Sequence, residues 1–248
     1  MTIVAWQRGG FAGGPAVLLL HGWGRDGAED FGVTGWVQAL SHAGYEALVP
    51  DLPGHGVSSD VAVPPNAEPA AWTAGILAQD LDRMGVGPVR LVGYAEGCLV
   101  AGHLAAKHAD RMRPLVLISR DDRVGMPGGE QLAARLRHDR SGVFDAEAEE
   151  LAARVLAGGR HHGPTLADWV ERATWPAAPR LATLGMPVLL AVGTEDEHRA
   201  GAPRLAQLFH DARLVTVPGD ARTLLESEEL VHAVVAFLKE HEGDARDD

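Results

Sequence analysis

The residues of this sequence that could do chemistry follow short apolar runs. One such run leads into Gly93-Tyr94-Ala95-Glu96-Gly97, where glycines stand two positions before and after Ala95. A residue at the tip of a tight turn between a strand and a helix crowds its neighbours, so such a turn needs glycine at both places. Ala95 has no atom that can attack a substrate, and this turn therefore offers no side-chain nucleophile at its tip.

Three charged residues, Asp121, Asp196 and Arg222, follow other apolar runs. A carboxylate can orient a polar group, whereas arginine stays protonated at any pH of interest and cannot act as a conventional general base. Asp196 could pair with Arg222 or position a polar group of a ligand. The alternative interpretation is an ion pair near the surface that contributes little to stability.

Apolar runs and helical spacing alternate along the chain. Continuous runs of about five residues suit strands that are buried on both faces of a parallel sheet, and they occupy residues 16–20, 46–49, 89–92, 115–118, 188–192 and 214–217. Apolar residues three and four apart predict helices over residues 34–43, 70–84, 97–108, 202–209 and 226–240. The alternation predicts an α/β fold.

Two parts of the chain depart from this alternation. Residues 2–6 are expected to form a strand that pairs antiparallel at one edge of the sheet. The interval from 121 to 185 is too long for a plain crossover, and helical segments at 129–140, 145–157 and 165–174 predict an inserted helical lid. The expected organisation is a core of residues 1–120 and 186–242, a lid of residues 121–185 and a flexible acidic tail of residues 243–248.

Several motifs occur in an order that resembles the α/β-hydrolase superfamily. They are His21-Gly22-Trp23-Gly24, Asp51-Leu52-Pro53-Gly54-His55-Gly56-Val57-Ser58, Leu91-Val92-Gly93-Tyr94-Ala95-Glu96-Gly97, Val192-Gly193-Thr194-Glu195-Asp196 and Val217-Pro218-Gly219-Asp220-Ala221-Arg222. The resemblance implies an α/β-hydrolase fold, with a mostly parallel sheet of about seven strands, flanking helices and a helical lid.

The resemblance also implies a degenerate catalytic triad. Ala95 stands at the position of the nucleophilic serine and Arg222 at that of the histidine, while Asp196 retains the acid. The backbone N–H groups of Trp23 and Glu96 correspond to the oxyanion hole, which does not depend on the lost side chains. Further candidate pocket residues are His21, whose family counterpart shapes the oxyanion turn, Tyr94 and Asp121.

The composition limits which classes of binding partner are expected. A net charge of −12 and an isoelectric point near 5.4 argue against a surface that attracts nucleic acid or anionic membranes. Small-molecule or protein partners are left, and of these we expect a small-molecule ligand or substrate. Cys98 is the one cysteine, and the first residues show no secretory signal pattern, so we expect a cytoplasmic protein. No glycine motif predicts a cofactor, and His161-His162 is expected to be exposed instead of binding a metal.

Three functional hypotheses follow from these residues. The favoured one is a non-hydrolytic enzyme, such as a lyase, isomerase or cyclase, that acts on a small, largely apolar carbonyl compound through a retained oxyanion pocket. The second is a pseudoenzyme that binds a small ligand. The third is an ester or amide hydrolase inactivated by an engineered serine-to-alanine change at the turn. Saturable binding, turnover and the activity of Ala95→Ser distinguish the three.

Overall fold

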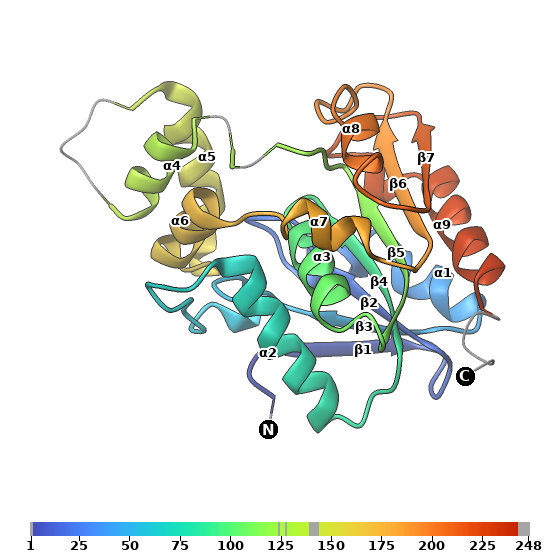
Figure 1. Cartoon of the computed structure of the whole chain (residues 1–248). Helices are drawn as coiled ribbons and strands as arrows, with labels where there is room; N and C mark the ends of the chain where they lie inside the picture. Colours follow the sequence, from blue (N-terminus) through green and yellow to red (C-terminus); the bar gives the residue numbers. More distant parts are fainter. Residues whose placement is uncertain (1, 124, 127, 139–143, 243–248) are drawn as a thin grey trace.

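The structure is a computed structural model of the whole chain, and it describes residues 2–123, 125–126, 128–138 and 144–242 (Figure 1). The expected acidic tail, residues 243–248, lies outside the described residues. In the part that is described, no helix is both long and apolar enough to pass through a membrane.

One seven-stranded sheet forms the centre of the fold, in the order β1-β3-β2-β4-β5-β6-β7. Its strands are β1 (Trp6–Gly10), β2 (Ala16–Leu20), β3 (Glu46–Pro50), β4 (Val89–Tyr94), β5 (Met112–Ile118), β6 (Val188–Gly193) and β7 (Ala212–Val217). Only β1 runs antiparallel, at the edge beside β3. The predicted α/β fold, with a mostly parallel sheet of about seven strands flanked by helices, is confirmed.

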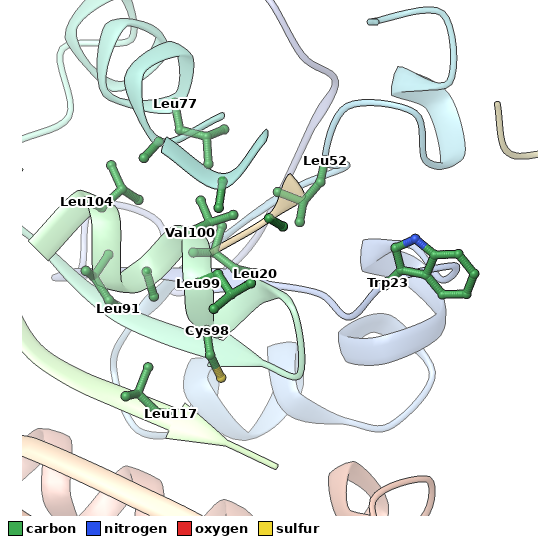
Figure 2. Close-up of a cluster of buried hydrophobic side chains, with 14 of the residues drawn as sticks. Leu20, Trp23, Leu52, Leu77, Leu91, Cys98, Leu99, Val100, Leu104 and Leu117 are labelled. Carbon is green, nitrogen blue, oxygen red and sulfur yellow. The ribbon is translucent and has the colours of Figure 1, made fainter. Parts of the chain in front are cut away.

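Helices cover both faces of the sheet, which explains why its central strands are apolar throughout. They are α1 (Trp36–His42), α2 (Pro69–Arg83), α3 (Gly97–Lys107), α7 (Ala178–Ala182), α8 (Ala202–Ala206) and α9 (Glu228–Glu240). Along β2, Leu18 and Leu20 belong to the apolar cluster that also contains residues of α2, α3, α7 and α8, whereas Val17 and Leu19 belong to the cluster that contains residues of α1 and α9. Figure 2 shows part of the first of these clusters, with Leu20 beside the start of α3.

The chain between β5 and β6 contains three further helices, α4 (Gly129–Leu136), α5 (Ala146–Leu156) and α6 (Gly163–Arg172), before α7. They pack together at one side of the molecule (Figure 1). Two indole N–H groups tie α6 to the core, because Trp23 Nε1 donates to the Leu166 carbonyl at 3.0 Å and Trp169 Nε1 donates to the Pro53 carbonyl at 3.2 Å. Short helical turns at Ala28–Gly32, Gly56–Ser58, Ala157–Gly159 and Leu224–Glu226 complete the fold.

The first strand differs from the prediction in its position. It pairs antiparallel at the sheet edge as expected, but over Trp6–Gly10 instead of residues 2–6. The backbone N–H groups of Ile3 and Val4 donate instead to the buried carboxylate of Asp80 on α2, at 2.7 to 3.1 Å. Because these hydrogen bonds pair the N–H groups of Ile3 and Val4 with α2 and not with the sheet, β1 begins later, at Trp6.

Candidate active site

The turn from β4 into α3 holds Ala95 in a strained backbone conformation. Its φ is +48°, in the left-handed region that side chains other than glycine rarely adopt. The flanking glycines have no room for a side chain, since a Cβ on Gly93 would lie 2.7 Å from the Cα of Cys98 and one on Gly97 would lie 2.1 Å from the carbonyl oxygen of Leu20. The structure thus places Ala95 at the tip of a tight turn between strand and helix.

The turn after β2 is held by buried polar groups. The imidazole of His21 is fully buried: its Nδ1–H donates to the Gly22 carbonyl at 2.8 Å, and its Nε2 accepts from the backbone N–H of Leu52 at 2.9 Å. The N–H of Gly22 donates to the carboxylate of Asp30 at 2.8 Å. Burial raises the pKa of Asp30 above its usual value, although this hydrogen bond and nearby positive charge act in the opposite direction. These contacts fix the backbone just before Trp23.

The side chain of Glu96 bridges the two turns. Its Oε2 accepts from the backbone N–H of Trp23 at 3.2 Å, and its Oε1 accepts from Nη1 of Arg120 at 2.9 Å. Arg120 lies just after β5 and is 5% exposed. The sequence drew attention only to the backbone N–H of Glu96, and nothing in its spacing indicated that its carboxylate would meet the N–H of Trp23.

Asp196 and Arg222 do not form an ion pair in the part of the chain that the structure describes. Oδ1 of Asp196 accepts from the backbone N–H of His198 at 2.9 Å, while its buried Oδ2 has no hydrogen-bond partner among the described residues. The side chain of Arg222 is exposed. Its loop nevertheless sits against the turn of Ala95, because the hydroxyl of Tyr94 donates to the carbonyl of Ala221.

Asp121 contacts a histidine instead of the candidate site. Its Oδ2 lies 2.6 Å from Nε of Arg123 and 3.3 Å from Nδ1 of His198. Burial acts to raise the pKa of Asp121, but the hydrogen bonds from Arg123 and the charge of His198 outweigh it and leave the pKa below its usual value. The carboxylate is therefore held ionised by its neighbours.

A cavity of about 470 Å³ joins the two turns to the helices between β5 and β6. Its lining consists of Trp23, Gly24, Arg25, Glu29, Tyr94, Glu96, Met126, Leu151, Arg154, Val155, Ala157, Arg160, His161 and Arg222. Of the predicted site residues it brings together Trp23, Tyr94, Glu96 and Arg222. Ala95, Asp196, His21 and Asp121 are not among the lining residues. Four arginines and two glutamates line this cavity, which gives it a positive balance although the chain is acidic.

His161 is a site residue that the sequence did not indicate. We expected it to be exposed, but it is half-buried, lines the cavity and packs edge-on against His55, with ring centroids 5.6 Å apart. His55 in turn packs against His21, at 5.1 Å between centroids. Burial lowers the pKa of His161 and, together with the neighbouring histidines, lowers the pKa of His55 far below its usual value. Both rings are therefore neutral at pH 7.

The described residues contain no group of three or more histidine, cysteine, aspartate or glutamate side chains that could hold a metal ion.

Comparison with known proteins identifies the family. Residues 15–157 match the α/β-hydrolase fold family. The chain belongs to this family. It is 30% identical over 224 residues to a pimeloyl-[acyl-carrier protein] methyl ester esterase of Chromobacterium violaceum, covering 86% of this chain and 82% of that protein. The esterase of the same name from Aeromonas hydrophila is 29% identical over 196 residues, covering 75% and 72%.

Solved structures agree on the fold. A thermophilic esterase from Thermogutta terrifontis superposes with a TM-score of 0.73 at 22% identity, covering 96% of this chain and 93% of that one. An enol-lactonase from Burkholderia xenovorans does so with a TM-score of 0.73 at 20% identity, covering 95% and 96%.

The comparisons correct the functional hypotheses drawn from the sequence. A non-hydrolytic lyase, isomerase or cyclase was favoured, with a ligand-binding pseudoenzyme as the alternative, because Ala95 and Arg222 stand where serine and histidine were expected. Both are wrong, since two relatives that align over most of the chain are named methyl ester esterases. The hypotheses rested on the residue types at two positions, Ala95 and Arg222. The alignments with the two esterases instead compare most of the length of the chain.

Proposed function

We propose that this chain is a hydrolase of carboxylic esters and that the cavity lined by Trp23, Glu96 and His161 is its active site. The observation that carries the proposal is the alignment with a named methyl ester esterase over 86% of the chain. The names of these relatives favour the methyl ester of an acyl chain as the substrate class. The apolar part of the lining, which includes Met126 and Leu151, suits the alkyl portion of such a substrate.

In this proposal the triad is degenerate, and an acyl-enzyme at position 95 is excluded. Ala95 has no nucleophilic atom and Arg222 cannot take up a proton, so a water molecule has to attack the ester carbonyl directly. Once the substrate has displaced the carboxylate of Glu96 from the N–H of Trp23, the backbone N–H groups of Trp23 and Glu96 would stabilise the negative charge that develops on the carbonyl oxygen. Cleavage then releases the carboxylic acid and the alcohol without a covalent intermediate.

His161 is the base that we assign to this reaction. It is the histidine among the cavity-lining residues, and because burial lowers its pKa the ring is neutral and able to accept a proton at pH 7. The proton that it takes from the attacking water would pass to the departing alkoxide. General base catalysis of this kind contributes about 10²- to 10⁴-fold to the rate.

We further propose that the protein works in the cytoplasm. We also propose that residues 121–185 act as a lid over this site. Leu151, Arg154 and Val155 of α5 line the cavity, and α6 is tied to the core by the indoles of Trp23 and Trp169. A segment in this place selects which acyl chain enters, because it forms the wall opposite the two turns.

Hydrolysis of methyl hexanoate, followed by titration of the released acid at pH 7, tests the proposal. We expect the chain to hydrolyse the ester above the uncatalysed rate and His161→Gln to lower the rate by about a hundredfold or more. Ala95→Ser, in which the tip gains a hydroxyl, distinguishes the routes: activity only in this variant would disprove direct attack by water but retain the site. Inactivity of the chain and of Ala95→Ser alike, with both proteins folded, would refute ester hydrolysis.

A further inference from the structure

The carboxylate of Glu96 is held as a bound carboxylate ligand would be. Each of its oxygens accepts from a different donor: the backbone N–H of Trp23, in the turn after β2, and the guanidinium of Arg120, just after β5. Glu96 is 15% exposed and Arg120 5%, so the contact is shielded from bulk water and stronger than a surface ion pair. Glu96 also lines the cavity, so a molecule entering the cavity meets this contact directly.

Glu96 does not use all the hydrogen-bond donors that surround it. Nε of Arg120 is buried and has no hydrogen-bond partner among the described residues, so the guanidinium retains capacity to bind an anion. On the cavity wall, Arg25 is paired with Asp30, and Arg160 with Asp26 and Glu29.

Arg154 and Arg222 also line the cavity, and within the described part of the chain their side chains form no hydrogen bond or ion pair, although the charge of Arg222 acts on the nearby carboxylate of Asp220. Cationic groups without a partner favour an anionic ligand in a partly enclosed space. They make the cavity suited to a negatively charged group. Arg120 does not line this cavity but lines a small adjoining pocket of about 10 Å³ together with Trp23 and Glu96, which line both.

We propose that Arg120 and the backbone N–H of Trp23 form a carboxylate-binding site, which Glu96 occupies in the free protein and from which a ligand carboxylate displaces it. The ligand class is an aliphatic carboxylic acid. Its choice rests on the proposed function, because this acid is the product of ester cleavage in the same cavity. Glu96 is thus an internal competitor: it limits how tightly the acid binds and promotes its release.

The competition follows from the number of donors. A ligand carboxylate and Glu96 cannot both accept from the N–H of Trp23 at hydrogen-bond distance, and two carboxylates beside one guanidinium repel each other. When Glu96 is replaced by neutral glutamine, Arg120 loses its counter-ion and an incoming carboxylate restores it. The gain expected from one charge-assisted hydrogen bond with a buried cation is about tenfold to a hundredfold in affinity.

Binding of hexanoate, measured by isothermal titration calorimetry, tests this assignment without requiring turnover. We expect Glu96→Gln to bind hexanoate at least about tenfold more tightly than the unaltered chain. Glu29→Gln is the matched control, since Glu29 lines the same cavity and loses the same charge, but is bonded to Arg160 and not to Trp23. It should change the affinity by less than about threefold. Hexanol, a neutral ligand of the same chain length, should bind the chain and Glu96→Gln alike.

Two further variants keep the test decisive if Glu96→Gln folds poorly. Glu96→Asp retains a counter-ion for Arg120 but is too short to reach both donors, so it should also bind hexanoate more tightly. In the double variant Glu96→Gln with Arg120→Gln, no buried charge is left unpaired, and the gain should disappear. Equal gains in Glu29→Gln and Glu96→Gln, or no gain in Glu96→Gln and Glu96→Asp, would overturn the assignment.

These outcomes are separable from the proposed hydrolysis. Tighter binding of hexanoate by Glu96→Gln, without hydrolysis of methyl hexanoate by any variant, supports the carboxylate site and refutes the esterase. Hydrolysis by the unaltered chain, with no change of hexanoate affinity in Glu96→Gln, supports the esterase and refutes the carboxylate site.

Discussion

Replacing Gly97 by alanine should destabilise the protein, although alanine is normally the better residue in a helix. A Cβ at this position would lie 2.1 Å from the carbonyl oxygen of Leu20 and 2.8 Å from that of His21. Both are backbone atoms of the strand and turn beneath α3, so neither can move away as a flexible side chain could. Overpacking of this kind costs about 1 to 3 kcal/mol, and the short distances place Gly97→Ala at about 2 kcal/mol or more.

The matched control is Gly75→Ala on α2, where no atom outside its own helix lies within 4 Å of the added Cβ. The same substitution should therefore stabilise the protein by about 0.5 to 1 kcal/mol, through the lower conformational entropy of the unfolded chain. Urea unfolding, followed by circular dichroism, measures both changes. If Gly97→Ala were as stable as the unaltered chain or more stable, the close contact between α3 and β2 that shapes the site would be refuted.

Two predictions concern ionisable groups in the core. Cys98 is fully buried, and burial raises the pKa of its thiol to about 12. The thiol should therefore not react with Ellman's reagent at pH 8 in the native protein, but should react fully in guanidinium chloride. Rapid reaction of the native thiol would contradict its burial. Burial, and then the neighbouring histidines, lower the pKa of His55 well below 6.5. The unfolded chain therefore takes up a proton at His55 that the folded chain excludes, and the free energy of unfolding should fall by about 1.4 kcal/mol per pH unit as the pH drops below about 6.5. His55→Gln should lose that part of the slope, and an unchanged slope in this variant would show that other groups cause it.

The parts of the fold that the sequence predicted are those in which local pattern and tertiary structure agree. The run at residues 16–20 became β2 with the predicted bounds, because a strand covered on both faces needs apolar residues at every position. Helix α2 was predicted within one residue at each end, and Glu68 caps it by accepting from the N–H groups of Ala70 and Ala71.

Contacts between distant segments were not predictable in the same way. The late start of β1 depends on Asp80, which lies more than seventy residues away in sequence and accepts from the N–H groups of Ile3 and Val4. The position of His161 depends on how the helices between β5 and β6 fold back on His55. Neither spacing nor composition encodes such pairings, whereas the positions of Trp23 and Glu96 followed from motifs that are local in sequence.

The turn of Ala95 shows why a fold can be identified more readily than its chemistry. Ala95 keeps a φ of +48° although it carries no group for the strain to present to a substrate. The strain is imposed by the surroundings: the N–H of Ala95 donates to the carbonyl of Ile118 at 2.9 Å, and Gly93 and Gly97 allow the helix to start directly against β2. The same packing would form with serine at the tip, so the motif indicates the turn and does not indicate what stands there. The ester hydrolysis and the carboxylate site proposed above depend on side chains from different segments, and Glu96, Arg120 and His161 are the ones to replace first.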